Sequence, residues 1–351
     1  MENTTTAIET VGCDLGDKKS ELFVMRPDGG CTRQTVRTSR EAFNKWFSRP
    51  RAHVVFEVGA HSRWVSELLT QLGHQVTIAN PRRVKAISES DTKTDRRDAE
   101  LLARLGRADA KLLAPVSHRP AQAQADLAVA KARDLLVSTR TKLINHIRGT
   151  IKSFGLRLPS CSSGAFARKT RDLVPPNLQP ALRPIYDSLE CIDEQIRTHD
   201  RAIEVASVRY PETDAISQIK GVGPLTALVF LLTIEDKHRF KSSRLVGAYL
   251  GLRPRKSQTG NDDPELRITK AGDPFLRRLL INCANYQLGP FGADSDLRRW
   301  GLEIAKRGRK SAKKRAVVAV ARKLAVLMHR LWVTGELYQP LGYRDSQRAA
   351  A

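Results

Sequence analysis

Residues 11–16 read VGCDLG and residues 53–59 read HVVFEVG, two short apolar runs that each carry one acid, Asp14 and Glu57. Apolar residues alternate along the first run, which predicts a strand with one buried face and places Asp14 on the opposite face. An acid on a neighbouring strand can meet Asp14 there. We therefore expect Asp14 and Glu57 to project together from one face of a sheet.

A second pair of acids lies in residues 93–105, which read KTDRRDAELLARL. Thr94 is a residue type that caps helices, so we expect a helix from Asp95 to about Leu105. Asp95 and Asp98 are three residues apart and would lie on one face of that helix, about one turn apart. The sequence therefore predicts two strand-borne acids and two helix-borne acids.

Four carboxylates at close quarters repel one another unless cations neutralise them. Hard oxygen ligands without histidine or cysteine are those that Mg²⁺ takes, and water and phosphate oxygens usually complete its coordination. One or two Mg²⁺ ions are thus expected if the four acids converge. Taken singly, each acid also fits an ordinary turn, strand end or surface position.

The charge balance points to a polyanionic partner. Lys and Arg number 60 against 37 Asp and Glu, which gives a net charge of +23 and a pI near 10.2. Phosphate neutralisation would supply much of the affinity, with strong salt dependence. We find no apolar run long enough to span a bilayer and no signal peptide in MENTTTAIET, so we expect a soluble, cytoplasmic, DNA-associated protein with no membrane partner.

The five cysteines are scattered and lack CxxC spacing, which indicates neither a disulfide framework nor a zinc site.

The chain changes character along its length. Residues 9–80 alternate short β-rich runs with two helical patterns, an α/β layout. Residues 120–206 carry two long helical patterns separated by a Pro, Ser and Gly-rich break. Two antiparallel helices, a coiled-coil arm that dimerises, or a plain helical spacer all fit this pattern. The expected class is therefore α/β plus α.

Residues 216–234, ISQIKGVGPLTALVFLLTI, place Gly221 and Gly223 in a tight turn before Pro224, which suits the first turn of a helix. The pattern is typical of a helix-hairpin-helix, whose glycines let backbone N–H groups approach a phosphate. A glycine turn that merely joins two helices fits equally well. A basic loop, a basic helix and a run of seven Lys or Arg within residues 306–315 follow, and phosphate binding is the favoured interpretation of this run.

These residues resemble, in order and over nearly the whole chain, the DEDD transposases of insertion sequences, which include the Piv-type DNA invertases and are known for bridge-RNA-guided recombination. The amino-terminal motifs that carry the resemblance are CDLG, FEVGAHSRWV, NPRRVKAISES and KTDRRDAELLARL. The carboxyl-terminal motifs are IKGVGPLTA, LGLRPRKSQTG, LRITKAGDPFLRRLL, DLRRWGL and KKRAVVAVARKLAVLMHRLW.

The resemblance implies a RuvC-like, ribonuclease H-like catalytic domain over residues 1–110 and a helical coiled-coil domain over 111–210. It further implies a mainly helical transposase domain with a nucleophile loop over 211–340, followed by a tail, 341–351. It implies that Asp14, Glu57, Asp95 and Asp98 bind Mg²⁺. A hydroxyl nucleophile from the carboxyl-terminal domain would attack a DNA phosphate and form a covalent protein–DNA intermediate.

The chain departs from the family pattern at the nucleophile. Members typically carry a serine directly before the glycine of the loop that here reads RKSQTG, where Thr259 precedes Gly260 and the nearest serine is Ser257. Thr259 can act as the nucleophile, although its β-branch restricts χ1. Ser257 can replace it through a shifted loop, or the covalent chemistry can be impaired. We favour Thr259, with a simple turn role as the alternative.

Basic residues around this loop are candidates for DNA or RNA phosphate contacts: Arg253, Arg255, Lys256, Lys270, Arg277 and Arg278. By resemblance, donor and target DNA would be recognised through a structured, bridge-type noncoding RNA, and the protein would work as a homo-oligomer, a dimer or a tetramer.

Two rival functions stay open at this point. A hydrolytic RuvC-like nuclease acting on branched DNA needs the four acids and no Thr259. A decayed, noncatalytic transposase that binds nucleic acid fits the missing serine but not the intact acids. A covalent adduct, nicking without an adduct, or binding without cleavage would distinguish the three.

Overall fold

The computed structural model describes residues 8–81, 84, 94–257, 266–308 and 311–342. The chain divides into two compact units, residues 1–118 and residues 119–351. Each unit has its own hydrophobic core, and each is described by itself.

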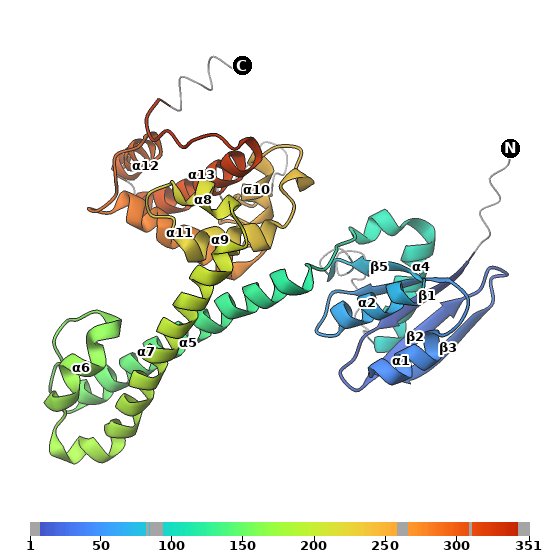
Figure 1. The fold of residues 1–351 in the computed structure, drawn as a ribbon, viewed down its shortest axis with the longest axis horizontal. Helices are drawn as coiled ribbons and strands as arrows, with labels where there is room; N and C mark the ends of the chain where they lie inside the picture. Colours follow the sequence, from blue (N-terminus) through green and yellow to red (C-terminus); the bar gives the residue numbers. More distant parts are fainter. Residues whose placement is uncertain (1–7, 82–83, 85–93, 258–265, 309–310, 343–351) are drawn as a thin grey trace. The chain divides into compact units, whose positions relative to one another are not determined.

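A five-stranded mixed sheet forms the centre of the first unit (Figure 1). Its strand order is β3-β2-β1-β4-β5. Strands β1, β2 and β3 form an antiparallel meander, and β4 and β5 continue the sheet parallel to β1. The strands are β1 (Glu9–Asp14), β2 (Lys19–Met25), β3 (Cys31–Arg37), β4 (Ala52–Glu57) and β5 (Gln75–Ala79).

Helices cover both faces of this sheet. Helices α1 (Arg40–Phe47) and α2 (Ser62–Gln71) pack against the face that carries Val11 and Cys13, and both residues are fully buried. Helix α4 (Asp95–Asp109) packs on the opposite face and continues into a short 3-10 helix, η1 (Ala110–Leu113). The alternation predicted for β1 is therefore confirmed, and α4 lies over the face that carries Asp14.

Small residues allow α4 to approach the sheet closely. A Cβ on Gly12 would lie 2.0 Å from the carbonyl oxygen of Ala99, and a Cβ on Gly106 would lie 2.5 Å from Cγ2 of Val55. Both distances are far below a van der Waals contact, so only glycine fits at either position. Helix α4 thus crosses the sheet from β2 towards β4.

Two long antiparallel helices, α5 (Ala121–Ser153) and α7 (Gln179–Val208), open the second unit. Arg133 pairs with Asp200, and Arg140 pairs with Asp193 at 2.7 Å, so residues early in α5 face residues late in α7. Of the arrangements predicted for this region, the intramolecular antiparallel pair is present.

A small core at one end of this helix pair holds Ile147 of α5 against Phe166 and Tyr186. The short helices between α5 and α7 are η2 (Ser163–Ala165), α6 (Phe166–Thr170), η3 (Arg171–Leu173) and η4 (Pro176–Leu178).

The other ends of α5 and α7 join a larger helical core, since Leu127 and Ala206 pack with residues of the carboxyl-terminal helices. Helix α9 lies at the centre of this core, and every residue from Thr226 to Ile234 is buried. The helices of this part are α8 (Glu212–Ser217), α9 (Pro224–Ile234), η5 (Lys237–Arg239), α10 (Arg244–Tyr249), α11 (Pro274–Leu288), α12 (Asp296–Lys306) and α13 (Ala312–Thr334).

The mixed sheet with many helices confirms the α/β plus α class and is consistent with a ribonuclease H-like first domain. Among the described residues, none of the helices combines the length and apolar character needed to cross a bilayer.

Candidate active site

Two strand-borne carboxylates lie side by side at one end of the sheet. Asp14 is the last residue of β1 and Glu57 is the last residue of β4, and both are half-buried. These parallel strands pair with Cys13 opposite Phe56, so the next residue of each strand is the acid. Neighbouring strands are about 4.8 Å apart, and equivalent positions project to the same face. The predicted meeting of Asp14 and Glu57 on one face therefore follows from this register.

A third carboxylate, which the motif reading missed, adjoins this pair. Glu21 of β2 lies directly opposite Asp14 in the antiparallel register. Its carboxylate accepts a hydrogen bond of 2.8 Å from Thr35 Oγ1 and forms an ion pair with Arg96 at 3.8 Å. The register of the β1–β2 hairpin decides this neighbour, and pattern alone does not specify register.

Helix α4 begins near this end of the sheet, because Arg96 in its first turn pairs with Glu21. Thr94 caps the helix as predicted, and its side chain accepts a hydrogen bond of 3.4 Å from the backbone N–H of Arg97. Asp95 is exposed and Asp98 is half-buried. The first turn of α4 thus carries both acids at the sheet end where β1 finishes.

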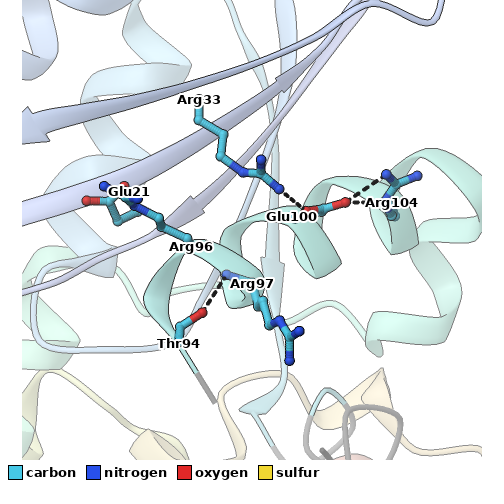
Figure 2. A network of polar contacts seen from close by, with 7 residues as sticks. All are labelled: Glu21, Arg33, Thr94, Arg96, Arg97, Glu100 and Arg104. Carbon is cyan, nitrogen blue, oxygen red and sulfur yellow. Dashed lines mark hydrogen bonds and ion pairs between the residues drawn. The ribbon is translucent and has the colours of Figure 1, made fainter. Parts of the chain in front are cut away.

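Arginines hold the next turn of α4 on the sheet. Figure 2 shows Arg33 of β3 and Arg104 of α4 approaching Glu100 from opposite sides, and Arg104 Nη2 lies 2.7 Å from the carboxylate. The hydrogen bond from Arg104 and the one from Arg33 hold the pKa of Glu100 below its usual value. In the same view Arg97 points away from Glu100. This network anchors α4 to β3 one turn after Asp95 and Asp98.

The donor set suits a hard divalent cation. Asp14 and Glu57 supply carboxylate oxygens from rigid strands, and Mg²⁺ is usually bound by one or two carboxylates together with water and substrate phosphates. Among the described residues, no three His, Cys, Asp or Glu side chains are grouped closely enough to hold one ion. Asp14 and Glu57 therefore fit a metal ion that a substrate phosphate also coordinates. Asp95 and Asp98 do not complete a coordination sphere made of protein ligands alone.

The thiol of Cys13 contributes no ligand to this site. It is fully buried on the other face of β1, and burial, with the Asp14 charge, raises its pKa.

In the second unit, the structure describes the base of the predicted nucleophile loop. Pro254 forms an isolated antiparallel bridge with Ile268, and the Arg255 N–H donates to the Arg267 carbonyl at 3.0 Å. These pairings bring the two ends of the loop together. Ser257 is exposed on the described part, whereas Thr259 lies outside the described residues.

Two of the predicted basic residues hold the loop base to other parts of the second unit. Arg277 Nη1 donates to the carbonyls of Leu250 at 3.0 Å and Ala271 at 2.7 Å, which ties α11 to the loop base. Arg278 pairs with Asp134 of α5. Four further predicted cations are exposed at or beside the loop base: Arg253, Arg255, Lys256 and Lys270.

The glycine turn joins α8 to α9 as predicted. Gly221 has a φ of +90°, which favours glycine, and a Cβ there would lie 2.6 Å from the Tyr286 ring. Gly223 precedes Pro224, the first residue of α9. The turn therefore packs on α11, and a phosphate contact at these glycines stays a prediction.

Comparison with known proteins adds independent findings. A family model described as "Transposase" of the DEDD type matches residues 11–155, and one described as "Transposase IS116/IS110/IS902 family" matches residues 213–296. A transposase for insertion sequence element IS1111A from Coxiella burnetii is 30% identical, over 82% of this chain and 79% of the relative. The chain belongs to the IS116/IS110/IS902 family of transposases.

Other relatives of this transposase extend the picture. A probable family 20 transposase of Pseudomonas aeruginosa is 28% identical over 88% of this chain and 92% of the relative. A pilin gene-inverting protein of Moraxella lacunata is 26% identical over 79% of each chain. The predicted similarity to transposases and to gene-inverting proteins is therefore confirmed.

The matched regions coincide with the two candidate sites of the transposase. The DEDD match spans β1 to the end of α5 and includes all four predicted acids, and the second match includes the glycine turn and the loop base. Membership makes the chain an enzyme that cuts and rejoins DNA, and the DEDD family implies dependence on a divalent metal.

Proposed function

We propose that this transposase cuts and rejoins DNA through a Mg²⁺ site formed by Asp14, Glu57, Asp95 and Asp98, together with a hydroxyl nucleophile, Thr259. One observation carries the proposal. Asp14 and Glu57 end adjacent parallel strands in register, and α4 starts beside them with its two acids in its first turn.

The strand acids would position the scissile phosphate. Their half-buried carboxylates lie on a sheet face that α4 covers at Gly12, so their positions are fixed by rigid elements. Mg²⁺, when bound, supplies charge stabilisation for the phosphorane-like transition state. Asp95 and Asp98 would approach from the helix once a phosphate and its ion occupy the space between helix and strands.

The nucleophilic step transfers a phosphoryl group to the protein. The Thr259 oxygen forms a bond to phosphorus, and its proton passes to a water or carboxylate. The bond from phosphorus to the leaving deoxyribose oxygen breaks, and that oxygen takes a proton from water. The released hydroxyl then becomes the acceptor when a second strand is joined. No oxidant or cofactor beyond the divalent ion is needed.

The basic surface would hold the polyanion. The exposed residues Arg253, Arg255, Lys256 and Lys270 lie at or beside the loop base, close in sequence to Thr259. Phosphate contacts position nucleic acid without specifying its sequence. We propose that a bridge-type noncoding RNA supplies the sequence recognition, and that a homo-oligomer brings the acids of one subunit to the nucleophile of another.

A denaturing gel tests this function directly. Purified protein would be incubated with the flanking noncoding RNA, Mg²⁺ and labelled DNA that spans the element junction. We expect a covalent adduct with wild type and with Ser257→Ala, and none with Thr259→Ala or Asp14→Ala.

Asp17→Ala is the matched control, because the Asp17 side chain is 91% exposed and lies three residues from Asp14. It should leave the adduct unchanged. An adduct that persists in Thr259→Ala but disappears in Ser257→Ala would move the nucleophile to Ser257. Mg²⁺-dependent nicking without any adduct would favour hydrolysis.

A further inference from the structure

A basic cavity lies within the second unit, and its lining includes none of the four acids. Its volume is about 530 Å³, within the range of small-ligand sites. Helices α10, α12 and α13 line it, together with the segment at 338–340. The cavity is part of the transposase domain, and neither the proposed Mg²⁺ site nor the glycine turn uses it.

Four cationic side chains and one carboxylate line this cavity. The cations are Arg244, Arg253, Arg322 and Lys323, and the carboxylate belongs to Asp296. Within the part of the chain that the structure describes, the guanidinium groups of the three arginines make no ion pair or side-chain hydrogen bond. Such a concentration of positive charge around a concave site favours a phosphate-bearing ligand.

The cavity also offers apolar and aromatic surface. Leu297, Val326 and the ring of Tyr338 share the lining with the cations. Tyr338 is half-buried, and its ring presents a flat face of the kind on which nucleobases stack. A phosphate alone would need only the cations, whereas a nucleotide uses both kinds of surface.

The wall that carries Tyr338 is anchored at two points. The backbone N–H of Tyr338 donates to Gln218 Oε1 at 2.8 Å, and the backbone N–H of Asp296 donates to the Pro340 carbonyl at 2.8 Å. The stem of Arg322, which lines the cavity, is closely packed as well, because a Cβ on Gly247 of α10 would lie 2.7 Å from its Cγ. The site is therefore built by fixed backbone contacts rather than by a loose surface chain.

Arg253 links the cavity to the loop base. Its side chain lines the cavity, and its carbonyl accepts a hydrogen bond of 2.9 Å from the Thr269 N–H across the base of the nucleophile loop. A ligand held by Arg253 would thus lie beside the base of the nucleophile loop.

We propose that this cavity binds one nucleotide through its phosphate and its base. The nucleotide either belongs to a strand of the bound nucleic acid, turned out of its stack, or is a free nucleotide. The proposal deepens the proposed function, since it assigns a second nucleic-acid contact to the same enzyme, but nucleotide binding requires neither Mg²⁺ nor chemistry.

Isothermal titration calorimetry of the full chain with deoxyadenosine 5′-monophosphate tests the site without RNA or metal. We expect one binding site, and deoxyadenosine should bind at least about tenfold more weakly because it lacks the phosphate. Arg322→Ala and Tyr338→Ala should each weaken binding by roughly tenfold. Arg322→Lys, which keeps the charge, should recover part of the affinity.

Lys142→Ala is the matched control, because Lys142 is an exposed cation of α5 outside the cavity lining. It should change the affinity by less than about twofold. The site is overturned if the monophosphate does not bind, if deoxyadenosine binds as tightly, or if Lys142→Ala weakens binding as much as Arg322→Ala.

A single-stranded oligonucleotide added to the same titration distinguishes the two sources. Competition with the monophosphate assigns the cavity to a strand nucleotide, and simultaneous binding assigns it to a free one. The adduct gel is read separately, so a protein that forms adducts but does not bind the monophosphate refutes only the cavity. One that binds the monophosphate without forming adducts refutes only the nucleophilic step.

Discussion

Gly12 of β1 lies so close to Ala99 of α4 that a Cβ on the glycine would be 2.0 Å from the Ala99 carbonyl oxygen and 2.5 Å from the Ala103 nitrogen. Asp14 lies two residues after Gly12 on the same face of β1. Asp95 lies one helical turn before Ala99 in α4. A single backbone contact therefore sets the spacing between a strand acid and a helix acid.

Gly12→Ala should displace α4, because backbone atoms rather than flexible side chains occupy the space. We expect a loss of about 3 kcal/mol in the unfolding free energy of the first unit, measured by urea denaturation, and loss of Mg²⁺-dependent cleavage. Gly149→Ala is the control, since nothing lies within 4 Å of a Cβ there and α5 gains a better helix former. Unchanged stability in Gly12→Ala would contradict the close approach.

Glu100→Gln should loosen α4 without removing any proposed ligand. The side chain is 23% exposed and bound by Arg33 and Arg104, so we expect a cost of about 1 kcal/mol. The pKa of Glu100 is lowered in the fold, so this contribution is present above the unfolded value, about 4.3, and is lost as the pH falls below it.

Urea denaturation at neutral pH and at low pH measures the contribution of Glu100, with the exposed Glu41→Gln as the comparison. If Glu100→Gln lowered the unfolding free energy as much at low pH as at neutral pH, the ion-pair explanation would be contradicted.

Asp126 joins α5 to the end of α7, and its removal should be costly. Its carboxylate accepts hydrogen bonds from Tyr210 Oη at 2.8 Å, from Gln122 at 3.0 Å and from Arg209. Burial raises its pKa, but these three hydrogen bonds together hold the pKa below its usual value. Asp126→Asn should cost about 2 kcal/mol at pH 7, and the difference should shrink as the pH falls below about 4.

Thermal unfolding of Asp126→Asn against the exposed Glu204→Gln measures this cost. An equal loss of stability in both variants would argue against the buried network.

The phenol of Tyr210 should ionise at an unusually high pH. Burial and the hydrogen bond to Asp126 raise its pKa to about 12. Its contribution to stability is present below the unfolded value, about 10, and is lost as the pH rises through the folded value. Ultraviolet titration of wild type against Tyr210→Phe should show one phenol ionising near pH 12. If the phenol that is lost in Tyr210→Phe ionised near pH 10 in the wild type, the contact between Tyr210 and Asp126 would be contradicted.

Arg277 should act on the loop rather than on DNA. Its guanidinium is committed to the carbonyls of Leu250 and Ala271, so Arg277→Ala should slow adduct formation at least about tenfold and leave the DNA Kd within about twofold. Arg255→Ala, at an exposed cation, should instead weaken DNA binding and reduce the slope of log Kd against log salt by about one. Reversed effects would assign Arg277 to phosphate contact.

Much of the fold follows from local pattern. The alternation in residues 11–16 predicted the buried face of β1, Thr94 predicted the start of α4, and Pro224 predicted the start of α9; each is confirmed. These features depend on neighbours in the chain, whose periodicity and capping chemistry are visible in the sequence.

Other features depend on partners far away in the chain. The ion pair of Arg278 with Asp134 joins positions 144 residues apart, and the predicted phosphate contact did not anticipate it. The sequence shows how many Lys and Arg residues this region contains. It does not show which of them form ion pairs within the protein.

By itself, the sequence determined the strands, the helices, the basic charge and the four acids of this transposase, because each is a property of local pattern or composition. Only the tertiary structure decided that Glu21 stands opposite Asp14, that α4 lies over the acid-bearing face, and that Arg253 reaches a cavity. Register, helix docking and side-chain partnership arise from packing between distant segments, which no single stretch of sequence encodes.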